Sequence, residues 1–159
     1  RYPTLKSHPL HEPFGQRGDG PTTAARYWGL TNQEYYAKAD VWPRNPEGEI
    51  FVMLMIEDLE GIANLRDILK EVPGISAVMI GEGDLSQELG IPRQYEHPEL
   101  LSAMAQIRSI CQEFNVPVAH PHVTTENVER VYDEGYRILV CGPSRTYPAL
   151  DKVRQLAGA

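Results

Sequence analysis

Short apolar runs alternate with segments of helical periodicity from residue 50 onward, and this alternation limits the possible folds most. The runs are IFVMLMI (50–56), AVMIG (77–81), VPVAH (116–120) and RILVCG (137–142). After each run, apolar side chains recur every three or four residues, as on one face of a helix. Successive strand–helix units predict a parallel sheet with right-handed crossovers, because each helix must return the chain to the same edge.

This α/β pattern has two possible architectures. Four units make about half of a TIM-type (β/α)8 barrel, which usually needs about 250 residues. An open doubly wound sheet is the alternative, because periodicity alone does not separate the two. No Gly-x-Gly-x-x-Gly turn follows the first run, which disfavours a nucleotide-binding version. The unbroken run 50–56 predicts a strand buried on both faces, and a polar loop is expected between residue 81 and a helix that opens at Pro98.

Residues 1–49 are expected to form an irregular segment with short helices that leads into the barrel units of residues 50–159. Thr31 and Glu34 have the spacing of a capping box, which predicts a short helix to about Asp40. Two prolines and a glycine in VWPRNPEGE then predict a loop. The chain begins without an initiating Met, and we expect it to be a fragment or a processed product.

The charge balance narrows the possible partners. A formal net charge of −7 and a sequence pI near 5.2 oppose binding to nucleic acid or to an anionic membrane surface. No apolar run reaches the roughly 20 residues that span a bilayer. Small polar substrates and a cytoplasmic location are therefore expected.

Two carboxylates stand where the first two predicted strands end. Glu57 directly follows the run 50–56, and Asp84 lies in the Gly-Glu-Gly-Asp segment after the second run. Strand ends meet at the active-site edge of parallel α/β folds, so a shared hard cation such as Mg²⁺ or Mn²⁺ is predicted, with Co²⁺ also possible. The glycines let the backbone approach a ligand, so the amides near Gly83 and Asp84 could receive a substrate carboxylate. Alternatively, Glu57 caps the next helix and Asp84 anchors a turn.

The ends of the third and fourth predicted strands carry further polar groups. The third run leads into His120-Pro121-His122. Its two histidines could bind zinc, form a polar wall that faces the substrate, or make ordinary loop hydrogen bonds. Arg145, after the fourth run, could bind an anion or lie exposed in its loop.

Three segments in their order and spacing resemble the HpcH/HpaI family of class II aldolases. They are MIEDLEGIANLRDIL, VPGISAVMIGEGDLSQELG and HPELLSAMAQI. The likeness runs from about Phe14 to the end and is strongest from Met55 to Glu99. It implies that the chain supplies four C-terminal units of a TIM-type barrel. It also implies cleavage, or formation, of a 4-hydroxy-2-oxo acid, which gives pyruvate or a related 2-oxo acid and an aldehyde.

The resemblance implies a metal site and a substrate site. The family's metal ligands are the Glu of an I-E motif and the Asp of a G-x-x-D-L-S motif, which match Glu57 and Asp84. The 2-oxo acid chelates the cation, the metal stabilises the enolate that forms when the C3–C4 bond breaks, and amides at Gly83 and Asp84 hold the carboxylate. His120 and His122 stand where many members are aliphatic, so a more polar aldehyde end is expected.

Departures from the family pattern limit what this chain could do by itself. Met55 stands where a Gln is common, and Glu82 adds a negative charge near the metal. The family's base His and its pyruvate-binding Arg belong to the N-terminal half of the barrel, and His8 and His11 are in the wrong place to replace that base. The catalytic residues are therefore unassigned here. We expect the 159 residues alone to be inactive.

The expected partners follow from the N-terminal half of the barrel, which these 159 residues do not include. A complementary N-terminal half is expected to complete the barrel, in an assembly that is a homo-oligomer. Two other functions stay open. One is a citrate-lyase-like or malyl-CoA-lyase-like enzyme, although the sequence has no basic cluster for CoA. The other is a non-catalytic half-barrel that serves as a binding or assembly subunit.

Overall fold

A computed structural model describes residues 20–142 and 147–158, and the chain divides into two compact units, 1–50 and 51–159. In the first unit, helix α1 (Thr22–Tyr27) contacts helix α2 (Asn32–Lys38). Strand β1 (Val41–Trp42) pairs with β2 (Ile50–Phe51), whose two residues span the boundary between the units. The predicted capping box at α2 is confirmed. The Glu34 amide donates to the Thr31 hydroxyl (3.2 Å), and the Thr31 amide donates to the Glu34 carboxylate (2.8 Å).

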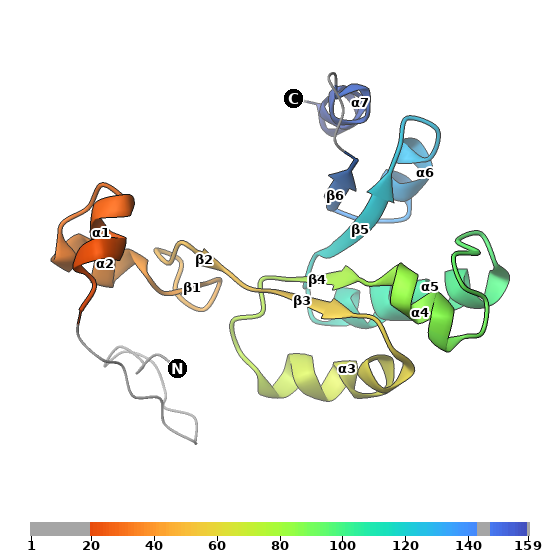
Figure 1. The fold of residues 1–159 in the computed structure, drawn as a ribbon, viewed down its shortest axis with the longest axis horizontal. Coiled ribbons are helices and arrows are strands. Elements are labelled where there is room, and N and C mark those ends of the chain that lie inside the picture. The colour runs from red at the N-terminus through yellow and green to blue at the C-terminus, as the bar shows by residue number, and fades with distance from the viewer. Residues whose placement is uncertain (1–19, 143–146, 159) are drawn as a thin grey trace. The chain divides into compact units, whose positions relative to one another are not determined.

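The second unit contains a parallel sheet of four strands in the order β3-β4-β5-β6 (Figure 1). The strands are Met53–Ile56, Ala77–Ile80, Val118–Val123 and Ile138–Cys141. The helices are α3 (Leu59–Glu71), α4 (Glu82–Glu88), α5 (Pro98–Glu113), α6 (Val128–Asp133) and α7 (Pro148–Ala157). The spatial order of the strands equals their order in the chain. A doubly wound sheet reverses its strand order at a switch point, so this order favours the barrel.

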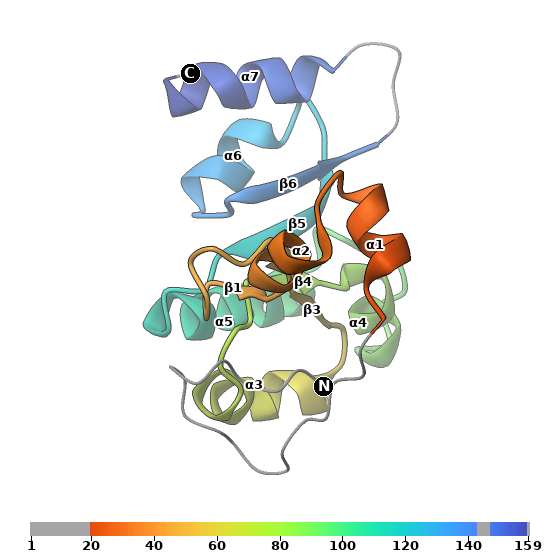
Figure 2. The same ribbon diagram turned by 90° about the vertical axis from the view of Figure 1, so that its left-hand side faces the viewer.

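Apolar side chains from α3 and α5 build the core of this unit against the sheet. Leu65 of α3 and Ile107 of α5 are fully buried with Val78 and Ile80 of β4. Their helical spacing places them on one face of each helix, and burial of that face is the main source of stability. Helix α6 packs on β5, and α7 lies beside α6 (Figure 2).

The structure corrects two expectations about local elements. The run 50–56 is not one strand buried on both faces, since it is divided between β2 and β3. Met53 and Met55 are 41% and 53% exposed, because successive strand residues point to opposite faces and the helices cover only one. The second correction is that α4 occupies the expected polar loop after residue 81. Its Leu85 is fully buried, which supplies the packing that the polar sequence did not suggest.

Candidate metal and substrate site

Glu57 and Asp84 follow two neighbouring strands at the same edge of the sheet. The register pairs Ile56 of β3 with Ile80 of β4, so Glu57 is level with Gly81. The Gly81 amide donates a hydrogen bond to the Ile56 carbonyl at 2.8 Å. The hydrogen bonding between the two segments therefore continues one residue beyond β4. Asp84 lies in the first turn of α4, where its side chain is exposed. Glu57 and Asp84 therefore follow adjacent strands at one edge of the sheet, and their use as metal ligands stays a prediction.

Gly81 provides the space that the Glu57 side chain occupies. A Cβ atom built on Gly81 would lie 2.9 Å from Glu57 Oε2 and would overlap Glu57 Cβ. The backbone at Gly81 has φ of −85°, so space rather than an unusual conformation requires glycine. The Glu57 side chain therefore lies against Gly81, the residue directly after β4.

The alternative in which Glu57 caps the next helix does not match the structure. The N-cap of α3 is Asp58, whose carboxylate accepts a hydrogen bond from the Gly61 amide. Glu88 of α4 accepts from another amide at this helix start, that of Leu59, at 2.7 Å. Asp58 and Glu88 accept hydrogen bonds from amides at the start of α3, so Glu57 is not the N-cap of this helix.

The first turn of α4 has no side-chain cap. The first hydrogen bond that closes a helical turn runs from the Leu85 amide to the Gly81 carbonyl (3.0 Å), so the preceding amides lack a helical acceptor. Apart from its chain neighbours and the backbone of its own helix, no atom of the described residues lies within 4 Å of the position that a Cβ on Gly83 would take. The Cα side of Gly83 is therefore open among the described residues, and binding of a ligand by the amides of Gly83 and Asp84 stays a prediction.

The donor set fits a hard cation with few protein ligands. Within residues 20–142 and 147–158, no group of three or more His, Cys, Asp or Glu side chains is placed to hold a metal ion. Carboxylate oxygens such as those of Glu57 and Asp84 are ligands that Mg²⁺ prefers, and water or substrate oxygens usually complete its coordination.

His120 and His122 lie in different surroundings. The bulge between His120 and Val123 interrupts the pairing of β5 with β6. The His120 side chain is buried, and its ring meets the Tyr136 ring edge-on with centroids 4.9 Å apart. Its Nδ1 accepts a hydrogen bond from the His122 amide at 3.2 Å. His122 has 60% of its side chain exposed. A shared zinc ion is not favoured by this arrangement.

Burial, together with the nearby charges of Arg130, His122 and Arg108, lowers the pKa of His120 to about 4. The unfolded chain protonates this histidine near pH 6.5, so between about pH 6.5 and 4 the unfolded state binds the extra proton. The free energy of unfolding is therefore expected to fall as the pH decreases through this window. In His120→Gln this loss should be smaller by at most about 3 kcal/mol. Urea unfolding of both proteins across the window measures the difference, and parallel pH curves would contradict it.

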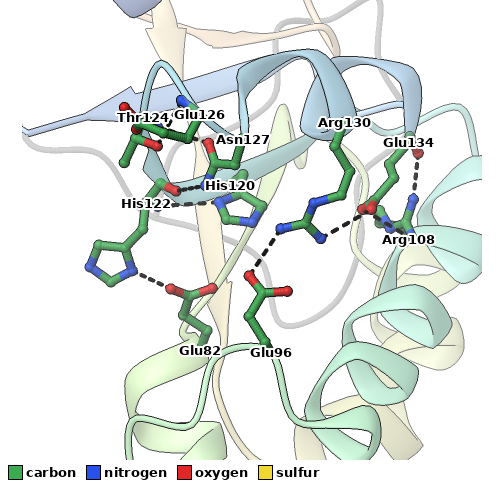
Figure 3. Close-up of polar contacts among 10 residues, drawn as sticks. All are labelled: Glu82, Glu96, Arg108, His120, His122, Thr124, Glu126, Asn127, Arg130 and Glu134. Carbon is green, nitrogen blue, oxygen red and sulfur yellow. Dashed lines mark hydrogen bonds and ion pairs between the residues drawn. The ribbon is translucent and has the colours of Figure 1, made fainter.

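Sequence reasoning missed the partner of His122. The buried carboxylate of Glu82 contacts His122 Nδ1, and Figure 3 shows the two side chains pointing toward each other. Glu82 attracts notice in the sequence as an extra acid, but 40 residues separate it from His122 and no local pattern links them. Arg145, His8 and His11 lie outside the described residues. In the described part of the chain, no helix is both long enough and apolar enough to cross a membrane.

Parallel β/α units in sequential order, with acidic side chains after adjacent strands, are typical of part of a TIM-type barrel. Comparison with known proteins agrees with this class. The family model of the HpcH/HpaI aldolase/citrate lyase proteins matches residues 20–146. The chain belongs to the HpcH/HpaI aldolase/citrate lyase family.

Individual relatives cover the chain to different extents. A 2-keto-3-deoxy-L-rhamnonate aldolase of Klebsiella pneumoniae is 35% identical over 97 residues, which are 60% of this chain and 33% of that protein. A family member from Burkholderia cenocepacia has a solved structure with a TM-score of 0.69 and 23% identity, covering 99% of this chain and 56% of its own. An HpcH/HpaI aldolase from Desulfitobacterium hafniense gives a TM-score of 0.65 at 21% identity, covering 94% of this chain and 55% of its own.

These likenesses confirm the expected fold class, about half of a TIM-type barrel. The chain spans about a third of the curated relative's length and just over half of each solved structure.

Proposed function

We propose that this chain carries the metal-binding half of an aldolase that cleaves, or forms, a 4-hydroxy-2-oxo acid. The products of cleavage would be pyruvate, or a related 2-oxo acid, and an aldehyde. The observation that carries the proposal is the position of Glu57 over Gly81, at the strand edge where Asp84 follows. The name of the Klebsiella relative describes an aldolase that acts on a 2-keto acid, which supports the same class of reaction.

In this proposal Glu57 and Asp84 hold a divalent cation, Mg²⁺ or Mn²⁺, with Co²⁺ as a further possibility. When bound, the cation supplies Lewis-acid chemistry, which polarises the 2-oxo group and stabilises the negative charge of an enolate. The two carboxylates would otherwise repel each other at this edge. Neutralisation of that repulsion favours occupancy by a cation.

The backbone at the start of α4 would orient the 2-oxo acid. The amides of Gly83 and Asp84, which lack a helical acceptor, would donate hydrogen bonds to the substrate carboxylate. The aldehyde part of the substrate would then extend past β5, where His122 is exposed. His120 is only 7% exposed, so it would contribute little surface to a polar wall of the substrate pocket. It would act mainly by accepting the hydrogen bond from the His122 amide, which holds the His122 backbone in place.

A complementary half-barrel is the partner that this sheet requires in the proposal. Met53, Met55 and Val140 are exposed on the strands, although residues of this kind normally fill a barrel interior. Strands β3 and β6 are also the edges of the four-stranded sheet, and unpaired edges promote association. We therefore place the missing base and the pyruvate-binding Arg in N-terminal units that complete the barrel. A cytoplasmic homo-oligomer is the proposed state of the completed protein.

Proton exchange on pyruvate tests the proposal without knowledge of the aldehyde. The full-length protein, with all its barrel units, is incubated with Mn²⁺ and pyruvate in D₂O, and loss of the methyl proton signal is followed by NMR. We expect exchange that stops on addition of EDTA and returns when Mn²⁺ is restored in excess. Absence of exchange, or exchange that EDTA leaves unchanged, would overturn the proposed function.

A further inference from the structure

Helix α4 is too short to hold its position by itself. It has seven residues, and no side chain caps its start. Isolated helices of this length are unstable in water, so contacts with the rest of the protein must fix α4. Asp84, one of the two proposed metal ligands, lies in its first turn. The position of Asp84 therefore depends on the contacts that α4 makes with neighbouring segments.

The inner face of α4 is held by two fully buried residues. Leu85 belongs to the apolar core of the second unit. Ser86 donates a hydrogen bond from its hydroxyl to the Gly83 carbonyl at 2.6 Å. The same hydroxyl accepts a hydrogen bond from the Arg93 amide at 2.9 Å. These contacts fix the depth of α4 in the core and its connection to the segment that follows it.

Glu88 connects α4 to the segment that carries the other proposed ligand. Its Oε2 accepts a hydrogen bond from the Leu59 amide at 2.7 Å. Leu59 is the first residue of α3 and lies two residues after Glu57. Glu88 lies four residues after Asp84, so both residues are on the same side of α4. The hydrogen bond therefore joins points close to both proposed ligands, on helices that follow the neighbouring strands β3 and β4 (Figure 1).

The chemistry of this hydrogen bond suits a connection between two helices. The first amides of a helix have no acceptor within it, so the Leu59 amide needs one from elsewhere. A carboxylate is a favourable acceptor there because it also interacts with the positive end of the helix dipole. Both residues are exposed, so the hydrogen bond adds little to the stability of the fold. Its main consequence is the relative placement of the two segments.

We propose that Glu88 is a positioning residue, which holds Glu57 and Asp84 at the separation that one shared cation requires. It acts through its hydrogen bond to the Leu59 amide. Among the residues that the structure describes, no three His, Cys, Asp or Glu side chains are grouped to hold a metal ion, so Glu88 is not placed as a third ligand. This inference rests on the proposed function and adds a residue outside the proposed ligand pair.

Three variants of Glu88 separate the effect of the hydrogen bond from that of charge. The dissociation constant of Mn²⁺ from the full-length protein is measured by the EPR signal of the free ion, at about 0.15 M salt to screen surface charges. Glu88→Gln removes the charge but keeps an oxygen at the same reach, so its affinity should stay within about threefold of wild type. Glu88→Asp keeps the charge but is one methylene shorter, and Glu88→Ala has no acceptor. Both should bind Mn²⁺ about 10-fold more weakly, the lower end of the range for groups that orient metal ligands.

Two controls exclude simpler explanations. Glu60→Gln removes an exposed acid from the first turn of α3, next to Leu59, and should keep the Mn²⁺ affinity within about twofold. The Tm of each metal-free variant is measured in parallel. A role in stability alone would lower the Tm of Glu88→Asp and leave its Mn²⁺ affinity unchanged. If Glu88→Ala does not fold, the comparison of Glu88→Gln with Glu88→Asp still decides the question, because both make small changes at an exposed position.

The outcomes separate this inference from the function on which it rests. Wild type that exchanges pyruvate protons, with full Mn²⁺ affinity in Glu88→Asp, overturns the role of Glu88 and leaves the proposed function in place. A loss of affinity in Glu88→Gln but not in Glu88→Asp shows an effect of charge and overturns that role as well. Wild type that binds Mn²⁺ but exchanges no pyruvate protons overturns the proposed function, while the Mn²⁺ affinities still decide the role of Glu88. Wild type that binds no Mn²⁺ overturns both.

Discussion

Replacement of Glu57 by Gln, or of Asp84 by Asn, is expected to reduce Mn²⁺-dependent exchange of pyruvate methyl protons by about 10²–10³-fold. Each substitution removes one of only two proposed protein ligands while nearly preserving side-chain volume. The bound cation stabilises the charge that develops as the methyl proton leaves, and loss of one preorganised electrostatic contact of this kind typically costs about 10²–10³-fold. Exchange rates of the full-length protein, measured by NMR in D₂O at saturating pyruvate, give the effect.

Two exposed acids on α3 provide matched controls for these variants. Glu71→Gln and Asp67→Asn make the same chemical changes away from the strand edge. Both should retain exchange within about twofold, since surface substitutions usually have small effects. Exchange that survives in Glu57→Gln and Asp84→Asn as it does in the controls would show that these carboxylates are not the ligands.

Gly81→Ala is expected to weaken Mn²⁺ binding by about 10–100-fold, the range typical for groups that orient a metal ligand. The new methyl group would overlap Glu57 Cβ and approach Glu57 Oε2, so the carboxylate must move from its position against Gly81. Titration of the full-length protein with Mn²⁺, followed by the EPR signal of the free ion, measures the dissociation constant.

Gly83→Ala makes the same change two residues later and provides the control. Outside the backbone of α4 and the neighbouring residues, the described part of the chain has no atom within 4 Å of the added methyl group, and α4 gains the higher helix propensity of alanine. Mn²⁺ affinity should stay within about twofold of wild type, while the KM for pyruvate should rise because the methyl group crowds the amide that binds the carboxylate. Equal Mn²⁺ affinities of the Gly81 and Gly83 variants would contradict the role assigned to Gly81.

The sequence predicted the β/α units because their signals are local. Helices α3 and α5 follow from apolar spacing, the Pro73-Gly74 pair stops the first of them, and Pro98 opens the second. The family resemblance, now confirmed, identified these units as part of a barrel. Helix α4 was missed because its short polar sequence has little periodicity, and its formation depends on the burial of Leu85 in the tertiary structure.

The sequence predicted only those features of the candidate site that follow from the order of the strands along the chain. Glu57 and Asp84 follow adjacent strands, so their proximity to one edge can be inferred from the chain. The space at Gly81 and the contact of Glu82 with His122 depend on the register between strands, which the sequence does not display. The different surroundings of His120 and His122 likewise depend on the bulge between β5 and β6, which no residue pattern predicts.

Anomalous diffraction from crystals of the full-length protein grown with Mn²⁺ tests the proposed cation site most directly. We expect one strong peak per subunit between the Glu57 and Asp84 carboxylates, with an oxygen of each within about 2.3 Å of the ion, close to the range for oxygen ligands of small hard cations. No peak at this edge, or a peak held by other side chains, would contradict the assignment and with it the proposed chemistry.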